Sequence, residues 1–307
     1  MLSNQSELEE LRRRIDGIDD NLLALLIDRI AVVSQVAALK SNGSAATYVP
    51  SREAAIIRRL VERNHGQLPV GTMVRMWREL LGAAVRHEGP FAVGAYLPPD
   101  GPGVWDLSRD HFGSQVPMTV FQTTLQVIRA VTDRRVSVGV LPMPQDGESD
   151  PWWVHLMAPD GDGPRVISRL PFGPRGNARS DGDALVIGYG PQVPSGGADR
   201  TLIATENAVD ISHGRLAGVF SSVGLTCTLI ASYAQREWAD TLIEIGEFVT
   251  LSDPRLAQLR ERLGSDLYRL LAIGFYAAPM AEASASSANS GRSQPIAMSS
   301  AAFSARS

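Results

Sequence analysis

The sequence has very little cysteine, because Cys227 is the one thiol among 307 residues. A single cysteine excludes an internal disulfide framework and any zinc site built from several cysteines. The five histidines do not occur in the paired spacing that is typical of metal ligands. These residue types therefore predict no metal site.

The sequence also lacks an excess of one charge, with 29 Lys and Arg residues against 33 Asp and Glu residues. This near balance provides no basic surface for nucleic acid or for an anionic membrane. No uninterrupted apolar run is long enough to span a bilayer. The first residues, MLSNQSELEELRRR, lack the apolar core of a secretory signal. We therefore expect no nucleic-acid partner, no membrane association and a cytoplasmic location.

A long amphipathic pattern occupies the start of the chain. Ser6 and Glu9 form a capping-box signature, and Ser41-Asn42-Gly43 provides a stop signal. A helix between them would be ~50 Å long at 1.5 Å per residue. It would have no core of its own, so we expect it to pack against helices of a second chain. Its apolar seam steps by three and four residues through Leu8, Leu11, Ile15, Ile18, Leu22, Leu25, Val32, Val36 and Leu39.

Arg29 occupies the position where this seam should carry another aliphatic residue. Arg12 lies seventeen residues earlier, which corresponds to ~25 Å and to a rotation of about 100°. One small ligand therefore cannot contact both from the same chain. Lys40 lies eleven residues after Arg29 and returns to nearly the same face. Arg29 and Lys40 can line one pocket, whereas Arg12 would serve a pocket in a partner chain.

Two further helices are predicted after Pro50-Ser51 and from Pro69 to the residues before Gly89-Pro90. They place Glu53 and Glu88 on their apolar stripes, with Arg52 beside Glu53. Each charge alone is explained by snorkelling or by solvation at a helix end, except Arg29, which lies in the middle of the seam. Several inward charges in one bundle instead favour a site for a dianionic small molecule, because an unpaired buried charge is expensive.

The segment from Leu11 to Lys40 and the following SREAAIIRRL resemble the all-helical chorismate mutases over roughly residues 7–90. The resemblance implies an intertwined homodimer that rearranges chorismate to prephenate without a cofactor. It implies that Arg29 and the partner's Arg12 bind the substrate carboxylates, that Lys40 donates to the ether oxygen, and that Glu53 accepts from the ring hydroxyl. Arg52 would support the carboxylate network.

Three positions depart from the family pattern. Glu88 matches a second donor to the ether oxygen that is usually Gln, so a carboxyl group there must be protonated to help. Val49 stands where Asp is common, and Ala84 stands where some members have Ser. We expect weaker substrate binding, or compensation by backbone groups, at the last two positions.

After Pro90 the chain alternates short apolar runs with a helical pattern, which predicts an α/β layer. The stretches YLPPDGPGVW and VGVLPMPQD resemble prephenate dehydratase motifs of bifunctional chorismate mutase–prephenate dehydratases. Their Glu-Asn-Ser is replaced by Pro144-Gln145-Asp146, and their Thr-Arg-Phe by Gly182-Asp183-Ala184. Residues 145–182 are rich in Gly, Pro, Asp and Arg, show little regular pattern, and replace a whole lobe. We expect a degenerate, inactive dehydratase-like domain over residues 91–190.

Residues 198–280 show a βαββαβ pattern that predicts a ferredoxin-like unit. The stretch His213-Gly214-Arg215-Leu216-Ala217 resembles the Gly-Ala-Leu turn of ACT regulatory domains. The Glu-Ser-Arg-Pro effector motif is replaced by Ile230-Ala231-Ser232-Tyr233, so dimerisation is expected rather than phenylalanine sensing. Residues 281–307 are rich in Ala and Ser, which predicts a disordered tail.

The expected fold is therefore multidomain, with an all-α domain over residues 1–90 followed by α/β and ferredoxin-like α+β domains. The leading functional hypothesis is chorismate mutase in aromatic amino acid biosynthesis. Two alternatives stay open, a bifunctional mutase–dehydratase and a non-catalytic regulatory protein that docks on another enzyme of the shikimate pathway. Trp152-Trp153 is either an exposed patch or a core anchor.

Overall fold

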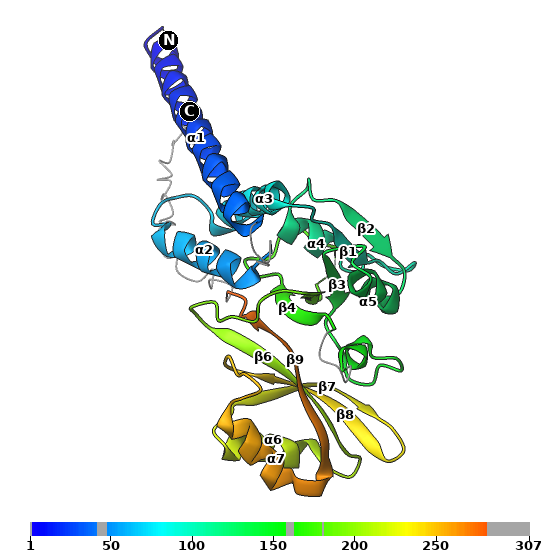
Figure 1. The fold of residues 1–307 in the computed structure, drawn as a ribbon. Helices are drawn as coiled ribbons and strands as arrows, with labels where there is room; N and C mark the ends of the chain where they lie inside the picture. The colour runs from blue at the N-terminus through cyan, green and yellow to red at the C-terminus, as the bar shows by residue number, and fades with distance from the viewer. Residues whose placement is uncertain (1, 42–47, 158–162, 180, 281–307) are drawn as a thin grey trace, which may run out of the picture.

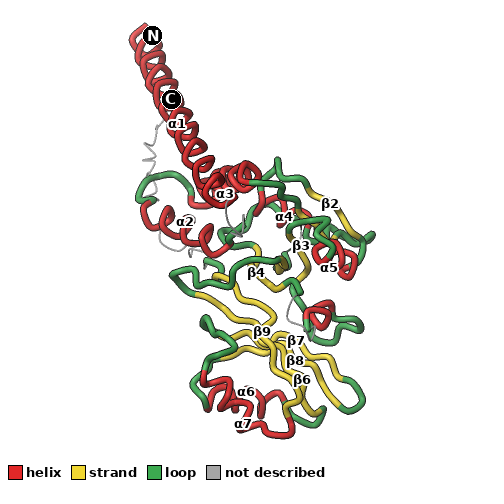
Figure 2. The backbone as a smooth tube through the Cα atoms, viewed as in Figure 1, coloured by secondary structure: helices red, strands yellow, loops and turns green. Residues whose placement is uncertain are grey.

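The computed structural model describes residues 2–41, 48–157, 163–179 and 181–280. The predicted disordered tail lies outside the described residues. The described chain combines three N-terminal helices with one large mixed sheet and four further α-helices (Figures 1 and 2).

The N-terminal helices are α1 (Leu2–Ser41), α2 (Pro50–Arg63) and α3 (Val70–Glu88). Pro50 occupies the first turn of α2, where its missing N–H leaves no hydrogen bond unmade. The predicted start of α1 at Ser6 is wrong, because the helix begins at Leu2 and includes Ser6. The four residues before Ser6 contain neither Pro nor Gly, so nothing in them interrupts the helix.

A single nine-stranded sheet contains all the described strands, in the order β2-β1-β3-β5-β4-β9-β6-β8-β7. Strand β1 pairs in parallel with β2 and β3, whereas β3, β5 and β4 pair antiparallel. The strands are β1 (Val93–Tyr96), β2 (Met118–Phe121), β3 (Val138–Pro142), β4 (Arg165–Leu170), β5 (Ala184–Gly188), β6 (Asp199–Ala208), β7 (Cys227–Ala234), β8 (Trp238–Ile245) and β9 (Leu267–Ala277).

The first half of the sheet is accompanied by α4 (Trp105–Phe112), α5 (Thr124–Thr132) and the 3₁₀ segment η1 (Trp152–Leu156). A capping box of Thr123 and Gln126 starts α5. The expectation of little regular structure over residues 145–182 is wrong, because η1 and β4 both lie there. Strand β4 lies between β5 and β9 with most of its residues buried, so it lacks the polar alternation that identifies a half-exposed strand.

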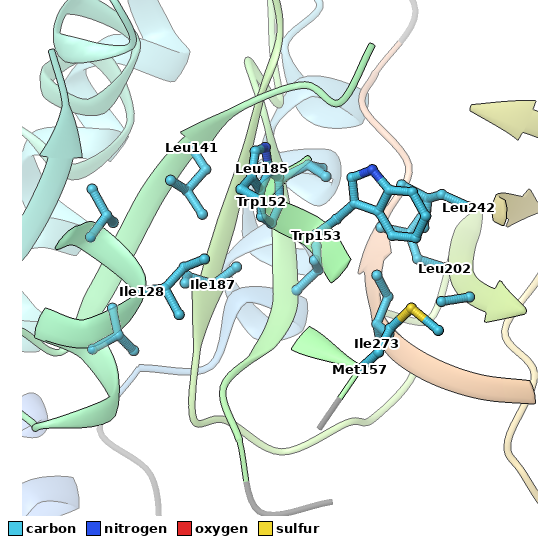
Figure 3. Packing of buried hydrophobic residues seen from close by; sticks show 14 of the residues in the cluster. Ile128, Leu141, Trp152, Trp153, Met157, Leu185, Ile187, Leu202, Leu242 and Ile273 are labelled. Atoms are coloured by element: carbon cyan, nitrogen blue, oxygen red, sulfur yellow. The ribbon is translucent and has the colours of Figure 1, made fainter. Parts of the chain in front are cut away.

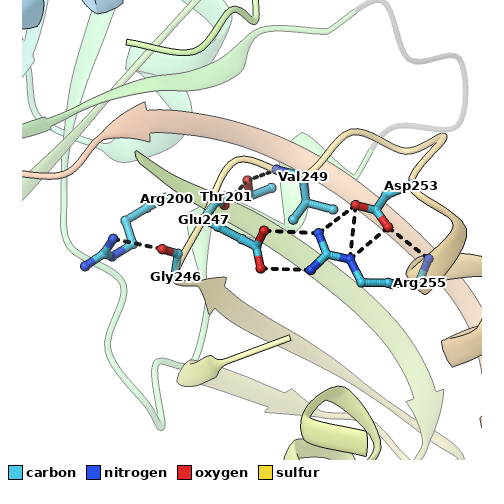
Figure 4. Close-up of polar contacts among 7 residues, drawn as sticks. All are labelled: Arg200, Thr201, Gly246, Glu247, Val249, Asp253 and Arg255. Atoms are coloured by element: carbon cyan, nitrogen blue, oxygen red, sulfur yellow. Dashed lines mark hydrogen bonds and ion pairs between the residues drawn. The ribbon is translucent and has the colours of Figure 1, made fainter. Parts of the chain in front are cut away.

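The last part of the chain follows the order β6-α6-β7-β8-α7-β9, with α6 (His213–Ser222) and α7 (Pro254–Leu263). Asp253 caps α7 by accepting a hydrogen bond from the Arg255 backbone N–H at 2.9 Å. The Arg255 guanidinium also binds Asp253 and Glu247, which ties the start of α7 to the loop after β8 (Figure 4). The short 3₁₀ turn η2 (Gly264–Asp266) leads from α7 into β9.

The tryptophan pair lies in the core, which resolves the alternative left open by the sequence. Trp152 and Trp153 are fully buried among residues of β3 and β5 on one side and of β6, β8 and β9 on the other (Figure 3). Trp152 Nε1 donates to the Pro142 carbonyl oxygen at 3.1 Å. This one apolar cluster therefore joins the two halves of the sheet.

Helix α1 extends away from the rest of the molecule and leaves its apolar seam uncovered (Figure 1). Ile18 is 57% exposed and Leu25 is 65% exposed. By length and composition, α1 is long enough and apolar enough to cross a membrane. It is the one such helix among the described residues. The sequence predicts no membrane-spanning segment when only uninterrupted apolar runs are considered. Asp28 and Arg29 interrupt the apolar stretch of α1, so that criterion does not detect it. This finding is weak evidence for a membrane span, because an amphipathic helix that packs on a partner has the same composition.

Candidate active site

The last third of α1 packs against the C-terminal end of α3, and this packing brings predicted site residues together. Lys40 Nζ lies 2.6 Å from Glu88 Oε2, and both side chains are largely shielded from solvent. Six residues before Lys40 on α1, Ser34 Oγ lies 2.7 Å from His87 Nε2. The two contacts set the register of α1 against α3, so the side chains of Lys40 and Glu88 are in direct contact.

Arg29 lies on the same face of α1 as Lys40, three helical turns earlier. Its Nη1 atom is buried and has no hydrogen-bond partner within the described part of the chain. Its positive charge acts on Glu53 and lowers the pKa of that carboxyl group. A buried guanidinium nitrogen without an acceptor is costly, and a bound carboxylate would remove the cost.

Glu53 is held at the start of α2 and is only 8% exposed. Its Oε2 atom accepts a hydrogen bond of 2.8 Å from Arg78 Nη1 of α3. Burial raises the pKa of Glu53 to about 6, against the opposing effects of Arg78 and Arg29, and nearby Glu88 raises it further. Glu53 therefore changes its charge close to neutral pH.

Arg78 is a site residue that the sequence analysis missed. It is 4% exposed, and it follows Val74 by four residues and precedes Leu81 by three. This spacing places it on the buried stripe of α3, by the same argument that singled out Glu88. The signal was therefore present, and Arg78 supplies the counter-charge for Glu53 within one chain.

The other two predicted cations lie apart from this cluster. Arg12 is exposed on the first half of α1, seventeen residues from Arg29. Arg52 is exposed on α2, beside the buried Glu53. The single chain therefore brings Arg29, Lys40, Glu53 and Glu88 together, and leaves Arg12 and Arg52 at the surface.

The two departures at Val49 and Ala84 have visible consequences. The Val49 carbonyl oxygen accepts from the backbone N–H groups of Arg52 and Glu53, at 3.0 and 3.3 Å, and its side chain provides no cap for α2. Ala84 is buried on α3 and offers no polar group. Backbone carbonyl acceptors thus satisfy the start of α2 where a side chain would otherwise do so.

The cluster combines cations with titratable carboxyl groups and contains no feature of a metal centre. No group of three His, Cys, Asp or Glu residues suited to a metal ion occurs in the ranges that the structure describes. Arg29, Lys40 and Arg78 oppose Glu53 and Glu88, which leaves one excess positive charge before any partner chain contributes. The arrangement can bind an anion, donate hydrogen bonds to it and accept one at Glu53.

Asp183 forms ion pairs with two arginines. Its Oδ2 atom accepts from Arg169 Nη2 at 2.8 Å, and its Oδ1 atom accepts from Arg175 Nη2 at 2.7 Å. Arg169 also reaches Glu244 of β8, to which the Tyr276 hydroxyl donates. An acidic residue at this position therefore forms part of an ion-pair network that connects β4, β5, β8 and β9.

Comparisons with known proteins find similarity to one family within the N-terminal helices. Residues 11–89 match the family Chorismate mutase type II. The chain is 32% identical over 152 residues to a bifunctional chorismate mutase/prephenate dehydratase of Pseudomonas aeruginosa, over 48% of this chain and 41% of that protein. The chain thus spans about two fifths of the length of this curated relative.

Solved structures also match the chain. A structure described as GqqA, a novel type of quorum quenching acylase, matches with a TM-score of 0.45 and 18% identity, over 61% of this chain and 95% of that one. Prephenate dehydratase from Streptococcus mutans matches with a TM-score of 0.42 and 15% identity, over 61% and 98%.

Proposed function

We propose that the protein is a chorismate mutase that converts chorismate to prephenate by a Claisen rearrangement. The observation that carries the proposal is the joint placement of Arg29, Lys40, Glu53 and Glu88 in one helical bundle, with Arg29 Nη1 buried and without a hydrogen-bond partner among the described residues. The match of residues 11–89 to Chorismate mutase type II supports it. The reaction is pericyclic, so the site must position and stabilise rather than supply a nucleophile.

The residues would share this work as follows. Arg29 binds one substrate carboxylate, since its Nη1 atom, which has no hydrogen-bond partner in the described part of the chain, can form charge-assisted hydrogen bonds. Lys40 donates to the ether oxygen, where negative charge develops as the C–O bond breaks. Glu53 accepts from the ring hydroxyl, and Arg78 holds the Glu53 carboxylate in place from the other side.

We further propose that the active protein is a homodimer in which Arg12 contributes to the site of the other subunit. The exposed apolar seam of α1 and the surface position of Arg12 support this arrangement. Two seams in contact would bury the side chains that a single chain leaves in solvent. Arg12 would then add a second guanidinium for the second carboxylate of the substrate.

We propose that residues 91–190 are a dehydratase-like domain without dehydratase activity, and that residues 198–280 are an ACT-like domain. The ion pairs of Asp183 with Arg169 and Arg175 support the first proposal, because a carboxylate engaged with two cations replaces the motif's arginine. The strand order β9-β6-β8-β7 with two helices supports a ferredoxin-like arrangement for the second.

One assay tests these proposals together. Purified protein is incubated with chorismate, and chorismate, prephenate and phenylpyruvate are followed in the same sample. Loss of chorismate with a matching gain of prephenate is expected, without phenylpyruvate. Formation of phenylpyruvate would establish the bifunctional alternative, and unchanged chorismate would favour the non-catalytic regulatory alternative.

The role of Glu88 yields a prediction about turnover. Glu88 Oε2 lies 2.6 Å from Lys40 Nζ, the group that would donate to the ether oxygen. Glu88→Gln removes a carboxylate from the place where negative charge develops and supplies an amide donor, so turnover should rise. Initial rates of the two proteins at one pH provide the measurement, and equal or lower turnover of Glu88→Gln would remove this role from position 88.

A further inference from the structure

A cavity of about 440 Å³ lies between the mutase helices and the dehydratase-like domain. Helix α3 forms one wall, α4 another, and the loop after β4 closes it. Its volume lies in the range that accommodates small-molecule ligands. The apolar part of its lining consists of Val74, Met76, Leu107, Pro171, Phe172 and Pro174.

The charged part of the lining is predominantly positive. Arg75, Arg78 and Arg175 line the cavity together with one carboxylate, Asp110. Arg75 forms an ion pair with Asp110, and Arg175 forms one with Asp183 outside the lining. The lining therefore combines an apolar body with three arginines that already have carboxylate partners, so an anion attached to a hydrophobic group must compete for one of these guanidinium groups.

Arg78 connects this cavity with the candidate active site. It lines the cavity, its guanidinium carbon lies 5.5 Å from the Phe172 ring centroid, and its Nη1 atom binds Glu53. Within the described residues, the bond to Glu53 is the one side-chain hydrogen bond that Arg78 donates. Its remaining N–H groups are available to a ligand, although the side chain is only 4% exposed.

We propose that this cavity is a regulatory site for a small monocarboxylate with an aromatic or similarly apolar body, which binds Arg78 in competition with Glu53. The regulatory consequence rests on the proposed chorismate mutase function, whereas the binding itself does not. The carboxylate of a ligand can accept two parallel hydrogen bonds from the Arg78 guanidinium. Such a pair is stronger than the single hydrogen bond that Glu53 accepts. Occupancy of the cavity therefore draws Arg78 away from Glu53.

Release of Arg78 changes Glu53, which faces Arg29 of α1, Arg78 and Glu88 of α3, and the neighbouring Tyr48 hydroxyl. Arg78 is the largest of the influences that oppose the effect of burial on the Glu53 pKa. Without it, the carboxyl group retains its proton to higher pH and no longer accepts from the ring hydroxyl. The ligand therefore inhibits the mutase and moves the acidic limb of its pH profile upward.

Calorimetric titration of the full-length protein with 3-phenylpropionate tests the binding. The uncharged 3-phenylpropanamide has the same size and serves as the matched ligand. We expect the carboxylate to bind at least tenfold more tightly than the amide. Equal affinities, or no heat with either compound, would overturn the proposal.

Variants locate the binding in the cavity. Thr72 lines it from an exposed position on α3, so Thr72→Trp fills the space without touching the candidate active site, and Thr72→Ser is the conservative control. We expect loss of binding in the first and retention in the second. Glu53→Gln frees Arg78 and should tighten binding, whereas the double variant Arg78→Met/Glu53→Gln should lose it. Unchanged affinity in Glu53→Gln would contradict competition for Arg78.

Activity separates this inference from the proposed function. If the protein is a mutase, 3-phenylpropionate should inhibit it, and Thr72→Trp should retain basal turnover but escape inhibition. Inhibition that persists in Thr72→Trp would mean that the compound binds at the substrate site, and the proposal would be wrong. Binding without any mutase activity would preserve the cavity as a ligand site and overturn the proposed function instead.

Discussion

Arg78 and Glu53 form a buried pair in which each charge depends on the other. Arg78→Met at pH 8 should lower the free energy of unfolding by ~3 kcal/mol, because it leaves an ionised Glu53 buried without its partner. The double variant Arg78→Met/Glu53→Gln carries neither charge and should recover most of the loss. Urea denaturation of the three proteins measures both effects. Equal stability of Arg78→Met and the unmodified protein would mean that other groups neutralise Glu53.

Glu53 alone should also produce a pH dependence of stability. Its pKa is raised from 4.5 to about 6 in the folded protein, so between these values the folded state holds a proton that the unfolded state has released. The contribution of Glu53 to the unfolding free energy therefore decreases as pH rises from 4.5 to 6, by about 2 kcal/mol, and is constant above. Glu53→Gln should lack this decrease. Denaturant titrations of both proteins across this range provide the comparison, and parallel curves would contradict it.

At the residue scale, helical periodicity predicted which charges point inward, but it did not predict how they pair. The sequence placed Glu53, Glu88, Arg29 and Lys40 on buried stripes, and the structure brings them together. Arg78 was missed because Glu88 was the one charged residue assigned to the stripe of α3, although Arg78 has the same helical spacing from its apolar residues. Pairing of Arg78 with Glu53 depends on the packing of α2 against α3, which separate helical patterns do not specify.

At the scale of elements, α1 is a long helix whose apolar seam the single chain does not cover. If that seam forms the dimer contact, Ile18→Lys should convert the dimer to monomers and lower mutase activity at least tenfold, because a lysine in the seam cannot be desolvated cheaply. Asp20→Lys introduces the same side chain on the opposite face and should leave the dimer intact. Sedimentation velocity measures the oligomeric state, and a dimeric Ile18→Lys protein would exclude this seam as the interface.

The elements that the sequence did not predict share a physical cause. Strand β4 and the segment η1 lie in a stretch rich in Gly, Pro, Asp and Arg, and both are buried by neighbours far away in the sequence. Local patterns identify amphipathic helices and half-exposed strands, because those elements carry a polar face. A short strand between two others carries no such face, so β4 becomes visible only through its pairing with β5 and β9.

At the scale of the whole molecule, one sheet connects the parts that the sequence divided into domains. Strand β4 pairs with β9 through Val166 and Gly274, and an added Cβ on Gly274 would lie 2.1 Å from the Val166 carbonyl oxygen. Arg58 of α2 binds the Ala198 and Ala278 carbonyl oxygens at the ends of β6 and β9. The helical bundle and the C-terminal strands are therefore in direct contact, so an event at one part can affect the other without a mobile linker.

The assembly itself provides the last test. If each active site combines Arg12 of one subunit with Arg29 of the other, Arg12→Ala and Arg29→Ala should each be inactive as homodimers. A heterodimer of the two variants carries both substitutions in one site and neither in the other, so it retains one intact site. Random mixing after co-expression makes half of the dimers hybrid, and activity should recover to about a quarter of the unmodified level. Rates of the mixture and of each variant alone provide the measurement. Recovery would require a site shared between subunits, whereas a mixture as inactive as its components would contradict a site that combines Arg12 of one subunit with Arg29 of the other.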